Sequence, residues 1–252
     1  MNSDFKGLIA VISGAGSGIG LAVAKKLKAQ GAEVFGLDLS AGELENSGAG
    51  IWIQCDIASD ESVNQAFKNI ASKVSKIDIL INNAGIGAQG GVEATTTEEW
   101  SKVLNINVIG TSRVSSAALP LMRKSSDGAI VNTCSVVATV GIPNRAIYSA
   151  SKGAILSLTL AMAADLLPER IRVNCVNPGT ADTPWVGRLL SQSADPAKER
   201  ASLEARQPIG RLISSDEVAN AIIYLAHPEQ KSTTGTVLAV DGGLHSLNLP
   251  KK

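Results

Sequence analysis

Short apolar runs rich in β-branched residues alternate with longer helical stretches along the whole chain, and this alternation most constrains the fold. The runs predicted as strands are residues 8–13, 33–38, 51–56, 77–85, 128–135, 171–179 and 235–243, and the predicted helices are 18–31, 60–74, 98–123, 149–167 and 215–226. Strands joined through helices pair in parallel, because each crossover returns the chain to the same end of the sheet. The pattern predicts an α/β fold with a doubly wound parallel sheet and helices on both faces.

No linker or change of composition divides the 252 residues, so we expect one domain over 1–252. Residues 182–212 are the exception, because this polar segment with three prolines follows the sixth predicted strand. Insertions after the carboxyl end of a strand are where α/β folds place loops that cover a substrate. We expect a substrate lid there, the alternative being a solvated helical excursion without a role.

Composition excludes several kinds of partner. Lys plus Arg and Asp plus Glu both number 23, which leaves no basic surface excess of the kind that binds nucleic acid. We see no apolar run long enough for a membrane span and no secretory leader, so we expect a cytoplasmic protein. The three cysteines and two histidines lack metal-ligand spacing, and we expect no metal. Cys134 is a candidate for oxidation because it precedes Ser135.

A glycine-rich turn, SGAGSGIG at residues 13–20, joins the first predicted strand to the first predicted helix. Gly14, Gly16 and Gly18 allow a tight turn and close approach of a ligand, and Gly20 allows the helix to pack closely on the sheet. The free N–H groups of the first helical turn and the helix dipole favour an anion. The sequence therefore predicts a pyrophosphate-binding turn, with Ser17 and Ile19 in it.

Asp38 ends the second predicted strand. A carboxylate at this place can accept hydrogen bonds from both hydroxyls of an adenosine ribose, and it repels the additional phosphate of NADP. No arginine or lysine stands beside it in the sequence. We therefore predict NAD as the cofactor, with Leu39 next to the ribose.

With the glycine turn, NNAG at 82–85, CS at 134–135 and YSASK at 148–152 in this order, the sequence resembles the short-chain dehydrogenase/reductase family over about residues 6–243. Ser13 departs from the threonine that is usual there and keeps the hydroxyl. The resemblance implies a Rossmann-type fold with a seven-stranded parallel sheet, usually as a homotetramer or homodimer. It further implies adenine contacts at Asp56 and Ile57, cofactor contacts at Asn83, Ala84 and Gly85, nicotinamide contacts at Pro178, Gly179, Thr180 and Thr183, and a catalytic role for Asn107.

Tyr148 and Lys152 are one helical turn apart and therefore share a helix face. Oxidation of an alcohol by hydride transfer requires a base for the hydroxyl proton, and free tyrosine, with a pKa of about 10, is a poor base at neutral pH. The Lys152 ammonium and the positive nicotinamide ring would favour the phenolate. Ser135 ends the fifth predicted strand and can hold the substrate oxygen, so Asn107, Ser135, Tyr148 and Lys152 are the predicted catalytic group.

Arg145, Arg188 and Arg206 suggest an acid substrate, because a guanidinium matches a carboxylate in a two-point contact. PNRAIY and NPGTADTPWV also resemble a branch of the family acting on hydroxy and keto acids, which includes 2-keto-3-deoxy-L-fuconate and 2-keto-3-deoxy-L-rhamnonate dehydrogenases and type-2 3-hydroxybutyrate dehydrogenase. We predict a deoxy sugar acid or hydroxy acid as the substrate, and hence a role in carbohydrate metabolism. The alternatives are a 3-oxoacyl-carrier-protein reductase and a dinucleotide sensor without turnover.

Overall fold

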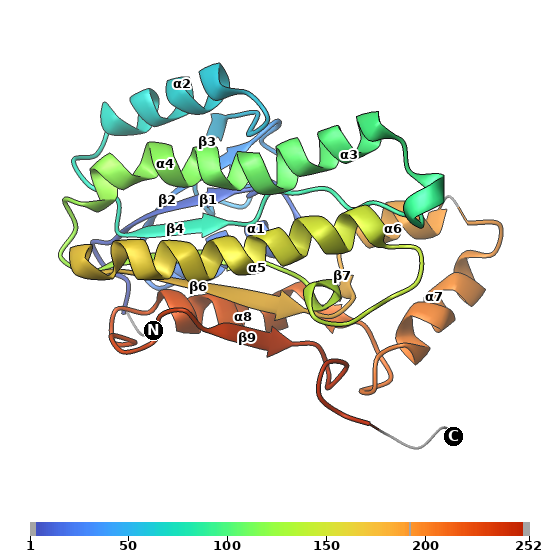
Figure 1. Cartoon of the computed structure of the whole chain (residues 1–252). Helices are drawn as coiled ribbons and strands as arrows, with labels where there is room; N and C mark the ends of the chain where they lie inside the picture. Colours follow the sequence, from blue (N-terminus) through green and yellow to red (C-terminus); the bar gives the residue numbers. More distant parts are fainter. Residues whose placement is uncertain (1–3, 192, 249–252) are drawn as a thin grey trace.

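The computed structural model describes residues 4–191 and 193–248, and its centre is one parallel sheet. Seven strands pair in the order β3-β2-β1-β4-β5-β6-β9, which confirms the predicted doubly wound sheet. The strands are β1 (Ile9–Ser13), β2 (Glu33–Asp38), β3 (Ile51–Gln54), β4 (Ile79–Asn82), β5 (Gly128–Thr133), β6 (Ile171–Pro178) and β9 (Val237–Val240). Figure 1 shows all their arrowheads directed toward the edge where α6 and α7 lie.

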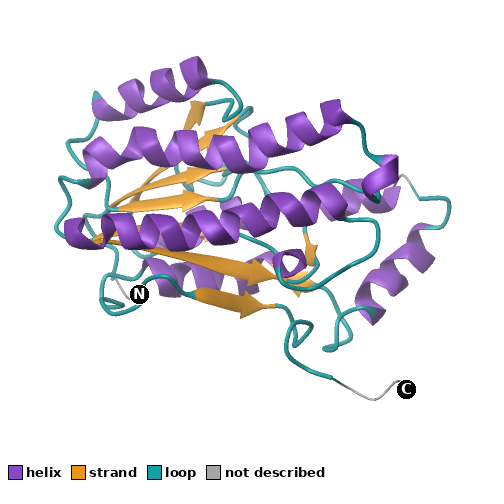
Figure 2. Ribbon diagram, in the orientation of Figure 1, coloured by secondary structure: helices purple, strands orange, loops and turns teal. Residues whose placement is uncertain are grey.

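Helices cover both faces of the sheet (Figures 1 and 2). On one face lie α1 (Gly18–Ala29) and α8 (Ser215–Ala226), whose apolar residues join those of β1 and β4 in one buried cluster. On the other lie α2 (Asp60–Ala71), α4 (Gly110–Met122) and α5 (Ala146–Leu166), packed in a second cluster. Three short 3-10 turns, η1 (Val92–Ala94), η3 (Val136–Ala138) and η4 (Leu167–Glu169), lie in connections.

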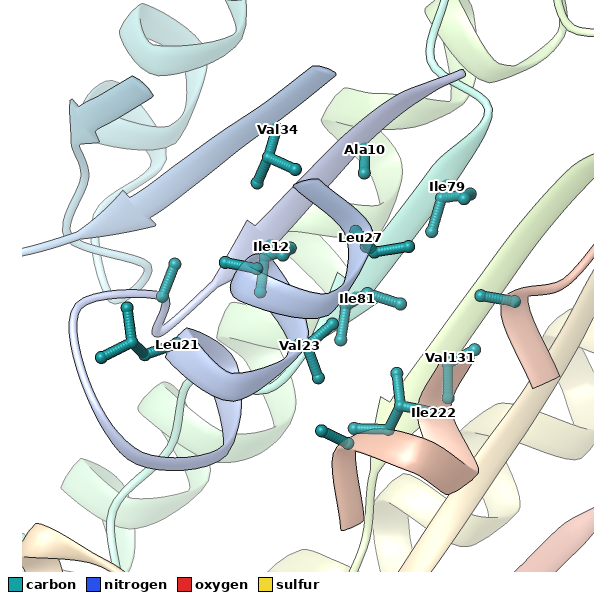
Figure 3. Close-up of a cluster of buried hydrophobic side chains, with 14 of the residues drawn as sticks. Ala10, Ile12, Leu21, Val23, Leu27, Val34, Ile79, Ile81, Val131 and Ile222 are labelled. Carbon is teal, nitrogen blue, oxygen red and sulfur yellow. The ribbon is translucent and has the colours of Figure 1, made fainter. Parts of the chain in front are cut away.

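The first core layer shows how sequence periodicity becomes packing. Alternate residues of β1 and β4, such as Ala10, Ile12, Ile79 and Ile81, point to the α1 side (Figure 3). Ile12 and Ile81 are paired in register and fully buried. Both faces of these strands are covered, which explains why their sequences read as continuous apolar runs.

The predicted helix over 98–123 is wrong in one respect, because it is interrupted. α3 (Thr97–Leu104) runs into a π-helical turn, η2 (Asn105–Ile109), before α4 begins. A π turn inserts one residue into the helical ladder and turns the side chains that follow. Asn107 lies in this turn and is 2% exposed. No periodicity in the sequence marks this irregularity.

Residues 180–214 leave the sheet and return to it through a narrow neck. β7 (Ala181–Asp182) pairs in parallel with β8 (Ile213–Ser214), and α6 (Pro184–Ser191) and α7 (Pro196–Ala205) lie between them. Val186, Leu190, Leu203 and Leu212 form a small core of their own. We call residues 180–214 the excursion. The segment contains no strand of the main sheet and is helical, as the alternative expectation had it, but the paired neck and the small core were not foreseen.

Other differences concern element ends. Most strands are shorter than predicted, and α5 begins three residues earlier than the predicted 149. The segment Ala146–Glu169 is long and apolar enough to cross a membrane by length and composition, contrary to our expectation that no such run exists. It packs on β6 and carries the Tyr148/Lys152 pair, so we read it as a core helix of this fold.

Candidate active site

The glycine turn is shaped by contacts that leave no space for side chains. Gly14 and Gly18 have positive φ angles of 69° and 54°. A Cβ on Gly20 would lie 2.0 Å from the Gly14 carbonyl oxygen, and one on Gly14 would lie 2.9 Å from Ala84. The start of α1 therefore packs closely against the turn that follows β1, and its first N–H groups face the carboxyl edge of the sheet.

Asp38 is tied to this turn. Its Oδ2 accepts a hydrogen bond of 2.9 Å from the Gly16 N–H, and a Cβ on Gly16 would lie 3.1 Å from the same oxygen. The carboxylate is therefore fixed beside the turn with its Oδ1 facing away from that bond. Of the predicted cofactor residues, Gly16 and Gly20 are buried inside the turn and do not line the cavity beside it.

That cavity, about 450 Å³ in volume, extends along the carboxyl edge of the sheet and is lined by all the other predicted site residues except Asn107. The remaining predicted cofactor residues line it, namely Gly14, Ser17, Gly18, Ile19, Asp38, Leu39, Asp56, Ile57, Asn83, Ala84, Gly85, Tyr148, Lys152, Pro178, Gly179, Thr180 and Thr183. The acidic residue, the glycine turn and the Tyr148/Lys152 pair thus border one continuous space, and an extended dinucleotide fits this order of groups.

Ser13 fastens β4 to the turn, a role that the sequence did not reveal. Its Oγ accepts hydrogen bonds from the N–H groups of Asn83 and Ala84, at 3.0 and 3.1 Å. The Asn83 amide in turn donates to the Gly14 carbonyl over 3.1 Å. The loop after β4 is therefore fixed to the glycine turn at three points, and the hydroxyl kept at position 13 is what these contacts require.

Tyr148 and Lys152 meet as the helical spacing predicts. The Lys152 Nζ lies 5.8 Å from the centre of the Tyr148 ring and donates a 2.9 Å hydrogen bond to the Thr133 carbonyl at the end of β5. Lys152 is only 6% exposed. Within the described residues, the hydroxyls of Tyr148 and Ser135 have no protein hydrogen-bond partner, and both residues line the cavity, so both hydroxyls are available to a ligand.

Asn107 lies behind the cavity rather than in its lining. Its amide makes a two-point contact with Ile86, accepting from the Ile86 N–H at 2.8 Å and donating to the Ile86 carbonyl at 2.9 Å. The same amide donates to the Ser151 hydroxyl over 3.1 Å. The side chain thus joins the loop after β4 to α5. Ser151 lies inside the YSASK motif, and its contact with Asn107 was not foreseen.

All three predicted arginines line the cavity. Among the described residues none of them has a carboxylate within ion-pair distance, whereas Arg113, Arg123, Arg200 and Arg211 all do. Burial lowers the pKa of Arg145, and the neighbouring positive charge of Arg206 lowers it further. Glu199 acts in the opposite direction from beyond ion-pair distance. Tyr148 also acts in this direction, but positive charge still gathers at this end of the cavity without a direct ion pair among the described residues.

Two contacts made by the excursion were missed by sequence reasoning. The Trp185 indole lies against Gly87, where a Cβ would come within 2.1 Å of the ring. The buried Gln207 amide donates to the Thr180 hydroxyl over 2.9 Å. Pro184 and Trp185 stand out in the sequence at the start of α6, but nothing there indicates what the indole would touch.

The cysteines are free thiols and all three are buried. Cys134 lies against Cys175 and donates to the Lys152 carbonyl. Its pKa is lowered by the contact with the Cys175 thiol and by the Lys152 ammonium. Among the described residues, no cluster of His, Cys, Asp or Glu could hold a metal ion. The predicted oxidation sensitivity of Cys134 stays a prediction.

Comparison with known proteins agrees with this geometry. The family model described as "Enoyl-(Acyl carrier protein) reductase" matches residues 14–245. The chain is 38% identical to the cis-4-hydroxycyclohexanecarboxylate dehydrogenase of Sinomonas cyclohexanicum, over 96% of this chain and 98% of the relative. It is 35% identical to 2-(S)-hydroxypropyl-CoM dehydrogenase 3 of Xanthobacter autotrophicus, over 98% and 100%.

Solved structures show the same likeness. The Thermoplasma acidophilum aldohexose dehydrogenase superposes with a TM-score of 0.91 at 32% identity, covering 100% of both chains. The 3-ketoacyl-(acyl-carrier-protein) reductase of Brucella melitensis, complexed with NADH, superposes with a TM-score of 0.87 at 33% identity, covering 96% and 99%.

The fold and the site define an oxidoreductase of the NAD(P)-dependent class, which acts on CH–OH groups. More particularly, the chain belongs to the short-chain dehydrogenase/reductase family.

Proposed function

We propose that the protein is an NAD-dependent dehydrogenase that oxidises a secondary alcohol on a carboxylic acid, or reduces the corresponding ketone. The observation that carries the proposal is the single cavity bordered by Asp38, by Ser135 with the Tyr148/Lys152 pair, and by three arginines without acidic partners. These groups supply, in order, a ribose acceptor, an acid/base centre and an anion site.

The preference for NAD rests on Asp38. The Gly16 N–H occupies one of its oxygens and leaves the other for a ribose hydroxyl. A second negative charge on that ribose would face this carboxylate, and like charges brought together cost several kcal/mol. Among the residues lining this end of the cavity, Leu39, Asp56 and Ile57 provide no positive charge to offset the repulsion.

The chain's own groups divide the work of proton transfer. The Tyr148 hydroxyl exchanges a proton with the substrate oxygen, and the Lys152 ammonium stabilises its anionic form across the 5.8 Å to the ring. Ser135 donates a hydrogen bond that orients the substrate oxygen. Asn107 keeps the Ile86 backbone in place. When bound, the nicotinamide accepts or returns the hydride.

An acid substrate is supported by the arginines. Arg145 and Arg206 are partly buried, and a carboxylate placed between them would relieve their mutual repulsion and restore hydrogen bonds lost on burial. Arg188 is exposed on α6 and can contribute at the rim. Two relatives carry a carboxylate or a coenzyme M group in their substrate names, which agrees with an anion site.

Among acids, the deoxy sugar acid and the 3-hydroxybutyrate type of substrate both stay predictions of the sequence resemblance. A carrier-protein reductase is supported by the family model's description and by one solved relative, but Asp38 and the balanced charge speak against NADPH and an acidic carrier. A sensor without turnover would not need the complete set of Asn107, Ser135, Tyr148 and Lys152.

The excursion serves as the substrate lid in this proposal, since it carries Arg188 and Arg206 into the cavity lining. A homodimer or homotetramer is supported by exposed apolar residues, namely Leu160 on α5, Leu167 in the η4 turn that follows it, and Ile109 at the end of η2. A cytoplasmic location, and the absence of membrane and nucleic-acid partners, stay predictions from composition. The end of the C-terminal tail, residues 249–252, lies outside the described residues.

The test is an assay of NADH absorbance with a panel of hydroxy acids, deoxy sugar acids and uncharged alcohols of matched shape. We expect turnover of an acid with NAD⁺, loss of at least about 1,000-fold in kcat for Tyr148→Phe with NADH binding retained, and a KM raised about tenfold or more in Arg145→Ala. Equal turnover of an uncharged isostere would overturn the acid substrate, and full activity of Tyr148→Phe would overturn the mechanism.

A further inference from the structure

The substrate end of the cavity combines positive charge with an otherwise apolar wall. Three segments border it: the loop after β4, the stretch from Ser135 to Tyr148, and the excursion. Apart from Asn83, Ser135, Tyr148 and the arginines, these segments contribute to the lining the apolar residues Ile86, Val136, Val137, Ile142, Pro184, Trp185, Val186, Leu189 and Leu203, with Ala84, Gly85, Gly87 and Ala181 and the hydroxyls of Thr180 and Thr183.

Polar side chains that could bind several substrate hydroxyls are scarce in this wall. Within the described residues, Asn83 is the one Asn, Gln, Asp, Glu or His from these three segments that lines the cavity, and its amide already donates to the Ser13 and Gly14 carbonyls of the glycine turn. Recognition of several neighbouring hydroxyls requires donors and acceptors placed for each of them, because a hydroxyl buried without a partner costs free energy. The three arginines supply donors only, and their charge is best matched by the carboxylate.

Hydrogen bonds and packing between the three segments fix the shape of this wall. The Gly90 N–H donates to the Asn144 carbonyl, and the Ala146 N–H donates to the Gly90 carbonyl, which joins the loop after β4 to the start of α5. Trp185 closes the opposite side against Gly87. Val136 and Val137 are buried in the 3-10 turn η3, directly after Ser135.

We infer that the substrate is an acid whose body, between the carboxylate and the reacting carbinol and around it, is hydrocarbon rather than polyhydroxylated. This inference rests on the proposed function and narrows it: of the two predicted types of acid, the hydroxy acid with an alkyl or cycloalkyl body fits the wall. The arginines hold the carboxylate, Ser135 and Tyr148 hold the single reacting oxygen, and Trp185 with the aliphatic residues covers the carbon skeleton.

A matched pair of compounds tests it. 3-Hydroxypentanoate and 2-deoxyribonate, which is 3,4,5-trihydroxypentanoate, share the five-carbon chain, the carboxylate and the reacting position, and differ by two hydroxyls. A hydrophobic pocket discriminates against one added hydroxyl by about 100-fold at most. We expect kcat/KM with NAD⁺ to be about 10- to 100-fold higher for 3-hydroxypentanoate, within that limit. Equal or faster oxidation of 2-deoxyribonate would overturn the inference.

Binding gives a readout that does not depend on turnover. The Tyr148→Phe variant with NAD⁺ is titrated calorimetrically with both acids and with 3-pentanol, and we expect Kd values to rise in the order 3-hydroxypentanoate, 2-deoxyribonate, 3-pentanol. Tightest binding of 3-pentanol would overturn the acid site itself and the proposed function with it. Tightest binding of 2-deoxyribonate would leave the acid site standing and overturn only the apolar body.

An isosteric substitution provides the matched variant. Val137→Thr places one hydroxyl in the wall at almost constant volume, and we expect the ratio of kcat/KM between the two acids to fall at least about threefold. Val140→Thr, outside the lining, is the control and should leave the ratio unchanged. An unchanged ratio in Val137→Thr, with thermal stability retained, would count against the wall as the source of selectivity.

Discussion

The glycine-turn half of the molecule and the excursion are built by opposite means, although both border the same cavity. In the first half, backbone groups are tied at close range: Gly20 packs on Gly14, and Asp38 accepts from the Gly16 N–H. The excursion instead stands on a two-residue strand pair and a core of four aliphatic side chains. A fixed cofactor requires close backbone approach, whereas a variable substrate requires side chains that can be exchanged without loss of the fold.

Substitution of a glycine in the turn should have the largest effect of the changes considered. Gly20→Ala would place a Cβ 2.0 Å from the Gly14 oxygen and 2.7 Å from the Asn83 amide. The turn must open, so we expect NADH binding weakened more than about 100-fold and unfolding made easier by about 3 kcal/mol. Fluorescence titration with NADH and thermal melting measure the two effects.

Gly187→Ala is the matched change in the excursion. Gly187 lies in α6 with no atom within 4 Å of a Cβ, so alanine adds only helix propensity. We expect unchanged NADH binding and stability raised by up to about 1 kcal/mol. A similar loss of NADH affinity in both variants would show that the two regions do not differ as described.

The glycine-turn side of the cavity was also easier to predict from the sequence than the excursion, and for the same reason. A backbone that must approach a ligand closely restricts residue type, so SGAGSGIG, Asp38 and YSASK carry position and chemistry together. The strands were found because both faces of the sheet are buried. Their ends were overestimated, since the predicted runs included polar and glycine residues that follow the last paired residue, such as those within 83–85 after β4 and 241–243 after β9.

What the sequence did not reveal depends on packing between distant segments. The π turn at Asn107 is fixed by hydrogen bonds to Ile86 and Ser151, residues 21 and 44 positions away. The contact of Trp185 with Gly87 joins two loops that no periodicity relates. The arginines were found as a residue type, but only the structure shows that they lack the carboxylate partners that Arg113, Arg123, Arg200 and Arg211 have.

Substitution of Asp38 should have the next largest effect, and this effect concerns the choice between NAD and NADP. Asp38→Asn keeps a hydrogen-bond acceptor for the Gly16 N–H and removes the negative charge. We expect the ratio of kcat/KM for NADP to that for NAD to rise about 100-fold, because the repulsion of the additional phosphate is removed. Asp56→Asn, also in the lining but at the adenine end, should leave this ratio unchanged. A constant ratio in Asp38→Asn would remove the basis for proposing NAD.

On the excursion side, Gly87→Ala should act on substrate alone. The new Cβ would displace the Trp185 ring, which it would otherwise approach to 2.1 Å. We expect the substrate KM to rise about tenfold while the KM for NAD stays constant, because the glycine turn is untouched. Gly91→Ala, in the same loop with open space around its Cβ, is the control. Trp185→Leu in the Gly87→Ala background should recover part of the loss, and an additive loss in the double variant would contradict direct contact.

The smallest expected effect lies where the excursion returns to the sheet. Glu217 caps α8 by accepting from the Ser214 N–H, and Arg211 holds its carboxylate with two hydrogen bonds. The Arg211 guanidinium, and then the Ser214 contacts, lower the pKa of Glu217 from 4.5 to about 2. Glu217→Gln should therefore lower the free energy of unfolding at pH 7 by about 1 kcal/mol, as measured by urea denaturation.

The sign of its pH dependence is fixed by that pKa. A carboxylate with a lower pKa in the folded state stabilises the fold above its unfolded pKa and loses this contribution as it is protonated. The stability difference between the wild type and Glu217→Gln should thus be complete above about pH 5 and shrink between pH 4.5 and 2. A difference that stays constant over this range would assign the effect to the shape of the cap rather than to its charge. NADH binding should be equal in both proteins at pH 7, because α8 begins beyond the neck and does not line the cavity.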